Sequence, residues 1–161
     1  MWNSSVDAHQ ILTNETAEIR LTLEPDDHSL SSLLSITNVL EIQISGNVRN
    51  TRICCNHSGG LQFVNAKSVT IEQLTFIGCG EISIISAKHV NIAKCTFTNN
   101  LNRRGSALNF KKINGTIKES SFMVYGGNAT GLATNASNIT IAGCKFMIKQ
   151  GRQLQQQRNY N

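Results

Sequence analysis

The sequence predicts an all-β protein, a right-handed parallel β-helix (solenoid) of about five coils with about three short strands in each coil. Three observations predict this fold. The stretch "LQFVNAKSVTIEQLTF" from Leu61 to Phe76 returns with small changes as "ISIISAKHVNIAKCTF" from Ile82 to Phe97. Apolar and polar residues alternate within each unit, as in a strand with one buried face. Charged residues make up only 16% of the chain, so uncharged polar and β-branched residues dominate, which suits strands and turns better than surface helices.

Aligning the apolar positions extends the opening pair to a series of units along the chain. The expected inward columns are Leu34, Leu61, Ile82, Leu108 and Leu132; Ile44, Ile71, Ile92, Ile117 and Ile141; Leu74, Cys95, Ser120 and Cys144; and Phe76, Phe97, Phe122 and Phe146. Each coil of a parallel β-helix climbs by one inter-strand spacing, about 4.8 Å, so equal residues stack on equal residues. An antiparallel sandwich with chance similarity between its strands is the alternative, but it gives no reason for the constant spacing of Ile and Phe.

The domain organisation follows from where the repeats begin and end. Residues 1–32 form an amino-terminal segment that we expect to cap the coils, because Leu21, Leu23 and Leu30 are apolar enough to close one end. Residues 33–150 are the β-helix coils. Residues 151–161 are a polar, Gln-rich tail that we expect to be disordered and unable to cover the last coil.

The units "NAKSVTIEQLTFIGCG", "CTFTNNLNRRGSAL" and "NASNITIAGCKF" resemble the repeats of large extracellular β-helix proteins. That group has a pectin-lyase-like fold and is often described as similar to polymorphic outer membrane proteins. The stretch "LTLEPDDHSLSSLLSITNVLEIQISG" looks like the opening segment of its invertebrate members. The resemblance implies an extracellular protein with a signal peptide and more coils, so we expect this chain to be a fragment of a longer protein. Fold similarity alone does not carry function with it.

The cysteines suggest one disulfide. Cys55 and Cys79 lie about one coil apart, so their Cα atoms should be about 5 Å from each other, within disulfide range. Cys95 and Cys144 belong to one inward column but lie about two rungs, or 10 Å, apart, so we expect them to be free, buried thiols. The alternative is that Cys55 and Cys79 are also buried free thiols that pack as small hydrophobic residues.

Seven sequons of the form Asn-X-Ser/Thr favour a glycosylated, extracellular chain. They are at Asn3, Asn14, Asn56, Asn114, Asn128, Asn135 and Asn138. Asparagine and threonine are also what the turns and solvent faces of a β-helix use, so this composition has a purely structural explanation as well.

Nothing in the sequence points to catalysis, a cofactor or a metal. Carbohydrate-active relatives of this fold use paired aspartates or aspartate clusters, whereas here Asp7, Asp26 and Asp27 all precede the repeats. The motif "CCNH" from Cys54 to His57 offers only half of a zinc ligand set. The basic residues that give the formal charge of +5 are scattered and few aromatic residues accompany them, which disfavours nucleic-acid binding. No apolar run is long enough to span a membrane.

Two longer loops, Thr98 to Ala107 and Met123 to Gly131, should leave successive coils on the same edge of the helix. Arg103, Arg104 and Tyr125 could form a ligand patch there for an acidic or sugar ligand, although surface loops without a function are the simpler interpretation.

The sequence therefore favours a non-enzymatic extracellular or cell-surface module, structural or ligand-binding. Its expected partners are glycans, extracellular proteins and further β-helix coils of the same or another chain. A carbohydrate-active enzyme of the pectin-lyase-like fold whose active coils are missing here is the alternative.

Overall fold

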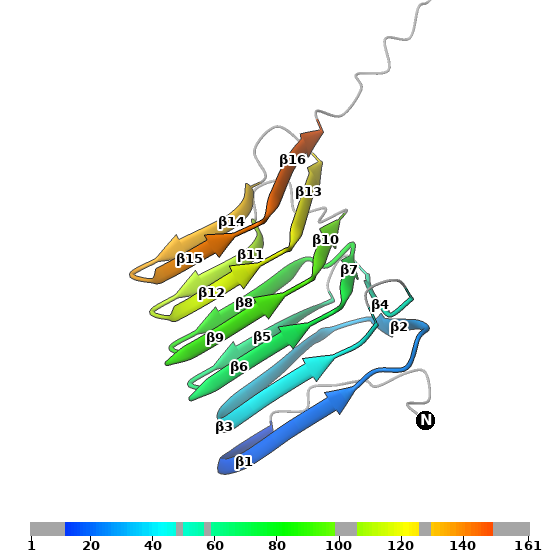
Figure 1. The fold of residues 1–161 in the computed structure, drawn as a ribbon. Helices are drawn as coiled ribbons and strands as arrows, with labels where there is room; N and C mark the ends of the chain where they lie inside the picture. The colour runs from blue at the N-terminus through cyan, green and yellow to red at the C-terminus, as the bar shows by residue number, and fades with distance from the viewer. Residues whose placement is uncertain (1–11, 48–49, 57–58, 99–105, 126–129, 150–161) are drawn as a thin grey trace, which may run out of the picture.

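A computed structural model describes residues 12–47, 50–56, 59–98, 106–125 and 130–149 (Figure 1). The predicted fold class is confirmed, because these residues form an all-β solenoid of about 5 turns whose strands pair in parallel. No helix occurs in the described part of the chain, and therefore none that is long and apolar enough to cross a bilayer.

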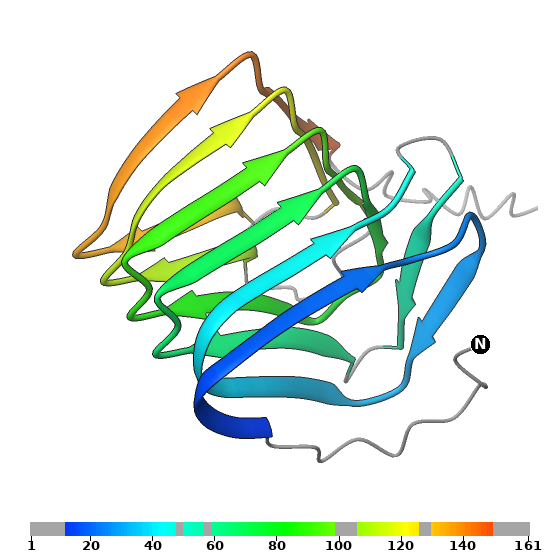
Figure 2. The ribbon, with the colours of Figure 1, turned by 60° about the horizontal axis from the view of Figure 1, so that its bottom comes forward.

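Each of the later coils contains three strands that turn in the same order (Figure 2). The strands are β1 (Leu12–Thr22), β2 (Asp27–Leu30), β3 (Leu33–Ser45), β4 (Arg52–Cys55), β5 (Gly60–Val64), β6 (Ser68–Glu72), β7 (Thr75–Ile77), β8 (Glu81–Ile85), β9 (His89–Ala93), β10 (Thr96–Thr98), β11 (Ser106–Lys111), β12 (Asn114–Lys118), β13 (Ser121–Tyr125), β14 (Thr130–Asn135), β15 (Asn138–Ala142) and β16 (Lys145–Lys149).

The strands form two hydrogen-bonded sheets. The larger runs β14-β11-β8-β5-β3-β6-β9-β12-β15, with β1 added on β3, and the smaller runs β16-β13-β10-β7-β4-β2. The long strand β3 joins two faces, because its first half pairs with β5 and its second half with β6. In the segment expected to be a cap, β1 and β2 pair in parallel with β3 and β4. The capping role of this segment stays a prediction.

The predicted inward columns are confirmed by the register. Ile44, Ile71, Ile92, Ile117 and Ile141 follow one another as direct partners on successive strands. The phenylalanine column is stacked ring on ring, with centroids 5.1 Å apart for Phe76 and Phe97, 4.9 Å for Phe97 and Phe122, and 4.7 Å for Phe122 and Phe146. The ring planes are within 8° of parallel. The repeat in the sequence therefore corresponds to one set of side chains that stacks in the same way from coil to coil.

A further inward column was not predicted from the sequence. Ile36, Phe63, Ile84 and Phe110 are direct partners on β3, β5, β8 and β11, and all four are buried. This column alternates aliphatic and aromatic side chains, so no single residue type marks it in the repeat. It fills the part of the core that lies against β3, β5, β8 and β11.

The column of Leu74, Cys95, Ser120 and Cys144 shows how the interior accommodates polar atoms. The Ser120 hydroxyl accepts a hydrogen bond from the Cys95 backbone N–H at 3.1 Å and donates one to the Lys118 carbonyl at 2.8 Å. Cys95 is a free, buried thiol, as predicted, and burial raises its pKa to about 12. Cys144 is free but only half-buried, because no described coil stacks above the last one.

Candidate functional site

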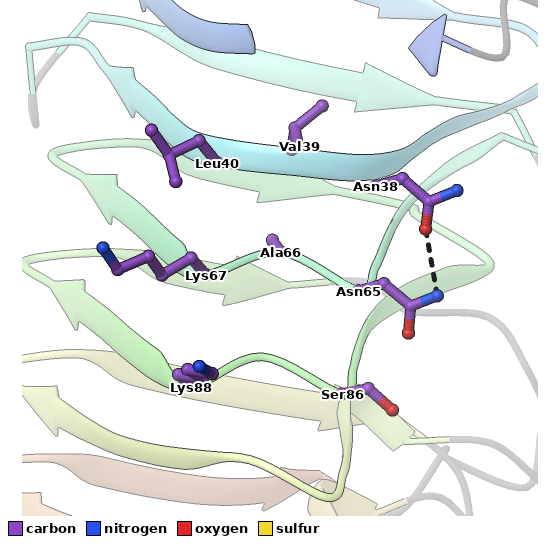
Figure 3. Close-up of a pocket in the computed structure, with 8 residues that line it drawn as sticks. All are labelled: Asn38, Val39, Leu40, Asn65, Ala66, Lys67, Ser86 and Lys88. Carbon is purple, nitrogen blue, oxygen red and sulfur yellow. Dashed lines mark hydrogen bonds between the residues drawn. The ribbon is translucent and has the colours of Figure 1, made fainter. Parts of the chain in front are cut away.

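A surface cavity lies along one corner of the solenoid, at Asn38–Leu40 within β3 and at the turns from β5 to β6 and from β8 to β9 (Figure 3). It has a volume of about 560 Å³. We call it the corner groove; it is lined by Asn38, Val39, Leu40, Asn65, Ala66, Lys67, Ser86 and Lys88. The predicted ligand residues are not among them.

The corner is built from a turn that repeats in each coil. Asn38, Asn65 and Ser86 have positive φ angles of 55°, 56° and 57°, the left-handed conformation that asparagine tolerates better than most residues. Each is followed by a buried residue, Val39, Ala66 or Ala87, that points into the core. The next residue therefore faces outward, and in two coils it is an exposed lysine.

Backbone hydrogen bonds between coils hold these turns in line. The Lys67 N–H donates to the Val39 carbonyl at 3.2 Å, and the His89 N–H donates to the Lys67 carbonyl at 3.0 Å. On the other side of the groove, the Asn65 side-chain amide donates to the Asn38 side-chain oxygen at 3.0 Å (Figure 3). The positions of the groove's polar groups thus follow from the coil spacing.

The charge of the corner groove is positive. Lys67 and Lys88 lie on adjacent coils and both side chains are exposed. No aspartate or glutamate lines the groove. The acid next to it in sequence, Glu41, forms an ion pair with Arg20 at 3.9 Å, which partly balances its charge. Two ammonium groups and neighbouring amide and hydroxyl groups suit an anionic, hydrogen-bonding ligand.

The lysine pair is specific to these coils. In the next coil, Gly115 is the partner of Val90. Val90 comes four positions after the left-handed residue Ser86, whereas Gly115 comes only three positions after the left-handed residue Lys112. The corner is therefore one residue shorter there, and Lys88 has no counterpart. The repeated Ala-Lys of "NAKS" and "SAKH" is the sequence signal that could have revealed the groove.

The sequence-predicted patch falls mostly outside the described residues. Arg103 and Arg104 lie outside the described residues. Tyr125 is described as the last residue of β13, but its side chain is not described. The strands that precede the two loops, β10 and β13, are direct partners, with Thr98 beside Met123. The loops therefore do leave neighbouring coils, while the patch itself stays a prediction.

The predicted disulfide is confirmed. Cys55 and Cys79 are bonded, with Cα atoms 4.6 Å apart, and link the coil of β4 to the coil of β7. The adjacent Cys54 is a free thiol whose pKa is raised, first by burial and then by the nearby Asp27 carboxylate. Within the described residues, no group of three or more His, Cys, Asp or Glu side chains could hold a metal ion.

The sequons divide between described and undescribed positions. Asn56, Asn114, Asn135 and Asn138 have exposed side chains, and Asn114 is the direct partner of Asn138 on the next coil. Asn14 lies in β1 without a described side chain, and Asn3 and Asn128 lie outside the described residues. Their use as glycan acceptors stays a prediction.

Comparison with known proteins gave no family model, no curated relative and no solved structure that matches this chain. The parallel β-solenoid is therefore established by the strand pairing itself, and the family resemblance rests on the repeats alone.

Proposed function

We propose that this chain is a non-enzymatic, extracellular or cell-surface β-helix module whose coils serve as a rod and whose corner groove binds an anionic group of a glycan or of an extracellular protein. The observation that carries the proposal is the groove of about 560 Å³. Lys67 and Lys88 line it, and no aspartate or glutamate is among its lining residues. Buried columns hold the turns in register, so the donors are positioned before a ligand arrives, which lowers the entropic cost of binding.

An extracellular location fits the chemistry of the cysteines and the sequons. A disulfide between neighbouring coils is typical of an oxidising compartment. Four described sequon asparagines are exposed and accessible to a glycosyltransferase. The repeat pattern supports the proposed kinship with pectin-lyase-like and polymorphic outer membrane protein-like proteins. If that kinship holds, further coils of a longer chain are expected to stack on the described coils.

Binding to immobilised heparin, polygalacturonate and neutral dextran tests the groove. The variant Lys67→Glu/Lys88→Glu should lose most of the binding that the parent shows, because each reversal replaces an attraction by a repulsion. The matched control is Lys94→Glu/Lys118→Glu, which removes the same formal charge from exposed lysines outside the groove. Equal loss in both variants would mean that net charge, and not the groove, determines binding.

The non-enzymatic part of the proposal has a separate test. The purified chain is incubated with the same acidic polysaccharides and the reducing ends and unsaturated products are measured over time. We expect no turnover. Cleavage of any of them would support the carbohydrate-active enzyme instead.

A further inference from the structure

The two ends of the described solenoid are complementary to each other. In Figure 1 the first coil, β1 and β2, lies at one end and the last coil, β14 to β16, at the other. In the described residues, β14, β15 and β16 each pair on one side only, with β11, β12 and β13. Their other edges carry the free N–H and C=O groups to which a further parallel coil would bond.

The last coil exposes the apolar side chains that are buried in every inner coil. The large hydrophobic residues found exposed among those described are Ile141 (46%), Phe146 (49%) and Met147 (41%), and all three lie in β15 and β16. Ile141 and Phe146 continue inward columns, because their partners Ile117 and Phe122 are fully buried. Met147 continues an outward column, because its partner Met123 is only half-buried. An apolar rung of this shape is matched by another coil that presents the same columns at the same positions.

The first coil presents two of the inward columns through Leu21 and Ile19, whereas the phenylalanine column begins there with His28, the partner of Ile53. Leu21 is the first member of the column that ends at Ile141, and Ile19 is the first member of the column that ends at Ile139. Leu21 also lines an apolar cavity of about 60 Å³ with Leu23, Leu30 and Leu34 at this end. A second copy stacked in register would therefore place its Leu21 over Ile141 and its Ile19 over Ile139.

The charges agree with the same register. Asp27, Arg52, Thr75, Thr96, Ser121 and Lys145 form one outward column from the first coil to the last. Inside the chain, Arg52 forms an ion pair with Asp27 across one coil spacing. At the junction of two copies, Lys145 would meet the next copy's Asp27 in the same geometry.

We propose that copies of this chain associate head to tail, the last coil of one stacking on the first coil of the next, so that the parallel β-helix continues across the junction. Such a contact is heterologous and does not close, so it produces an open series of oligomers. The proposal is independent of the corner groove, which lies on the side of the solenoid.

Sedimentation velocity of the full 161-residue chain over a range of concentrations tests the proposal. The parent should form oligomers beyond the dimer that grow with concentration. Ile141→Glu blocks the last coil and Leu21→Glu blocks the first, so each alone should be monomeric, while an equimolar mixture should form a dimer and nothing larger. Circular dichroism verifies that each variant is folded.

A charge exchange provides a second test that leaves the core untouched. Lys145→Glu and Asp27→Lys should each weaken self-association roughly tenfold, because each places like charges at the junction. Mixing the two should restore it, whereas Lys94→Glu, away from both ends, should change nothing. A parent that stays monomeric, a dimer that only last-coil variants abolish, or a mixture without recovery would each overturn the proposal.

Discussion

Phe97 shows how a single residue carries the stability of a stacked coil. Its ring is fully buried between those of Phe76 and Phe122, with both neighbours about one coil spacing away. We expect Phe97→Ala to lower the free energy of unfolding by about 3–5 kcal/mol, because the flanking coils fix the backbone and the cavity cannot collapse. Urea unfolding followed by circular dichroism measures the change.

Phe146→Ala is the matched control for that substitution. Phe146 belongs to the same column but is 49% exposed, so truncating it removes less buried area and should cost clearly less than Phe97→Ala. Equal costs at a concentration where the chain is monomeric would contradict the assignment of Phe146 to an open end.

At the scale of elements, the disulfide joins two coils that are already held together by strand pairing and by the stacking of Ile53 on Phe76. It closes a loop with a sequence separation of 24, for which chain entropy predicts a stabilisation of about 3 kcal/mol. We expect Cys55→Ala/Cys79→Ala to lower the free energy of unfolding, measured by urea titration, by that amount. Cys54→Ala, which alters the adjacent free thiol, should have little effect. Peptide mapping without reductant should recover Cys55 linked to Cys79, and a free Cys79 in oxidised material would contradict the pairing.

The elements differ in how well the sequence predicts them. The strands around Ile71, Ile92 and Ile117 were predictable because the same residue types recur at one spacing. The strand β1 was not, because its pairing with β3 shifts register near Asn14 and the apolar spacing is interrupted there. The corner groove was also missed, since a single exposed lysine in a turn looks like an ordinary solvated residue. The repeat places Lys67 and Lys88 on adjacent coils, but only the structure shows that both line one cavity.

At the scale of the whole molecule, each coil is stabilised almost entirely by its two neighbours, so stability should vary along the solenoid. The central strands β6, β9 and β12 have coils on both sides and completely buried Ile71, Ile92 and Ile117. Hydrogen exchange should therefore be slowest in these strands and fastest in β14, β15 and β16, which pair on one side only within the described chain.

The concentration dependence of that exchange links local stability to assembly. If copies stack head to tail, raising the protein concentration should slow exchange in β15 and β16 and in β1 together, because both sides of the junction gain partners at once. The central strands should not change, since their amides are already bonded to coils on either side. Mass spectrometry of peptides from each strand at two concentrations measures this. Protection gained in β15 and β16 without any gain in β1 would indicate a tail-to-tail contact, whose symmetry closes at the dimer and cannot extend the rod.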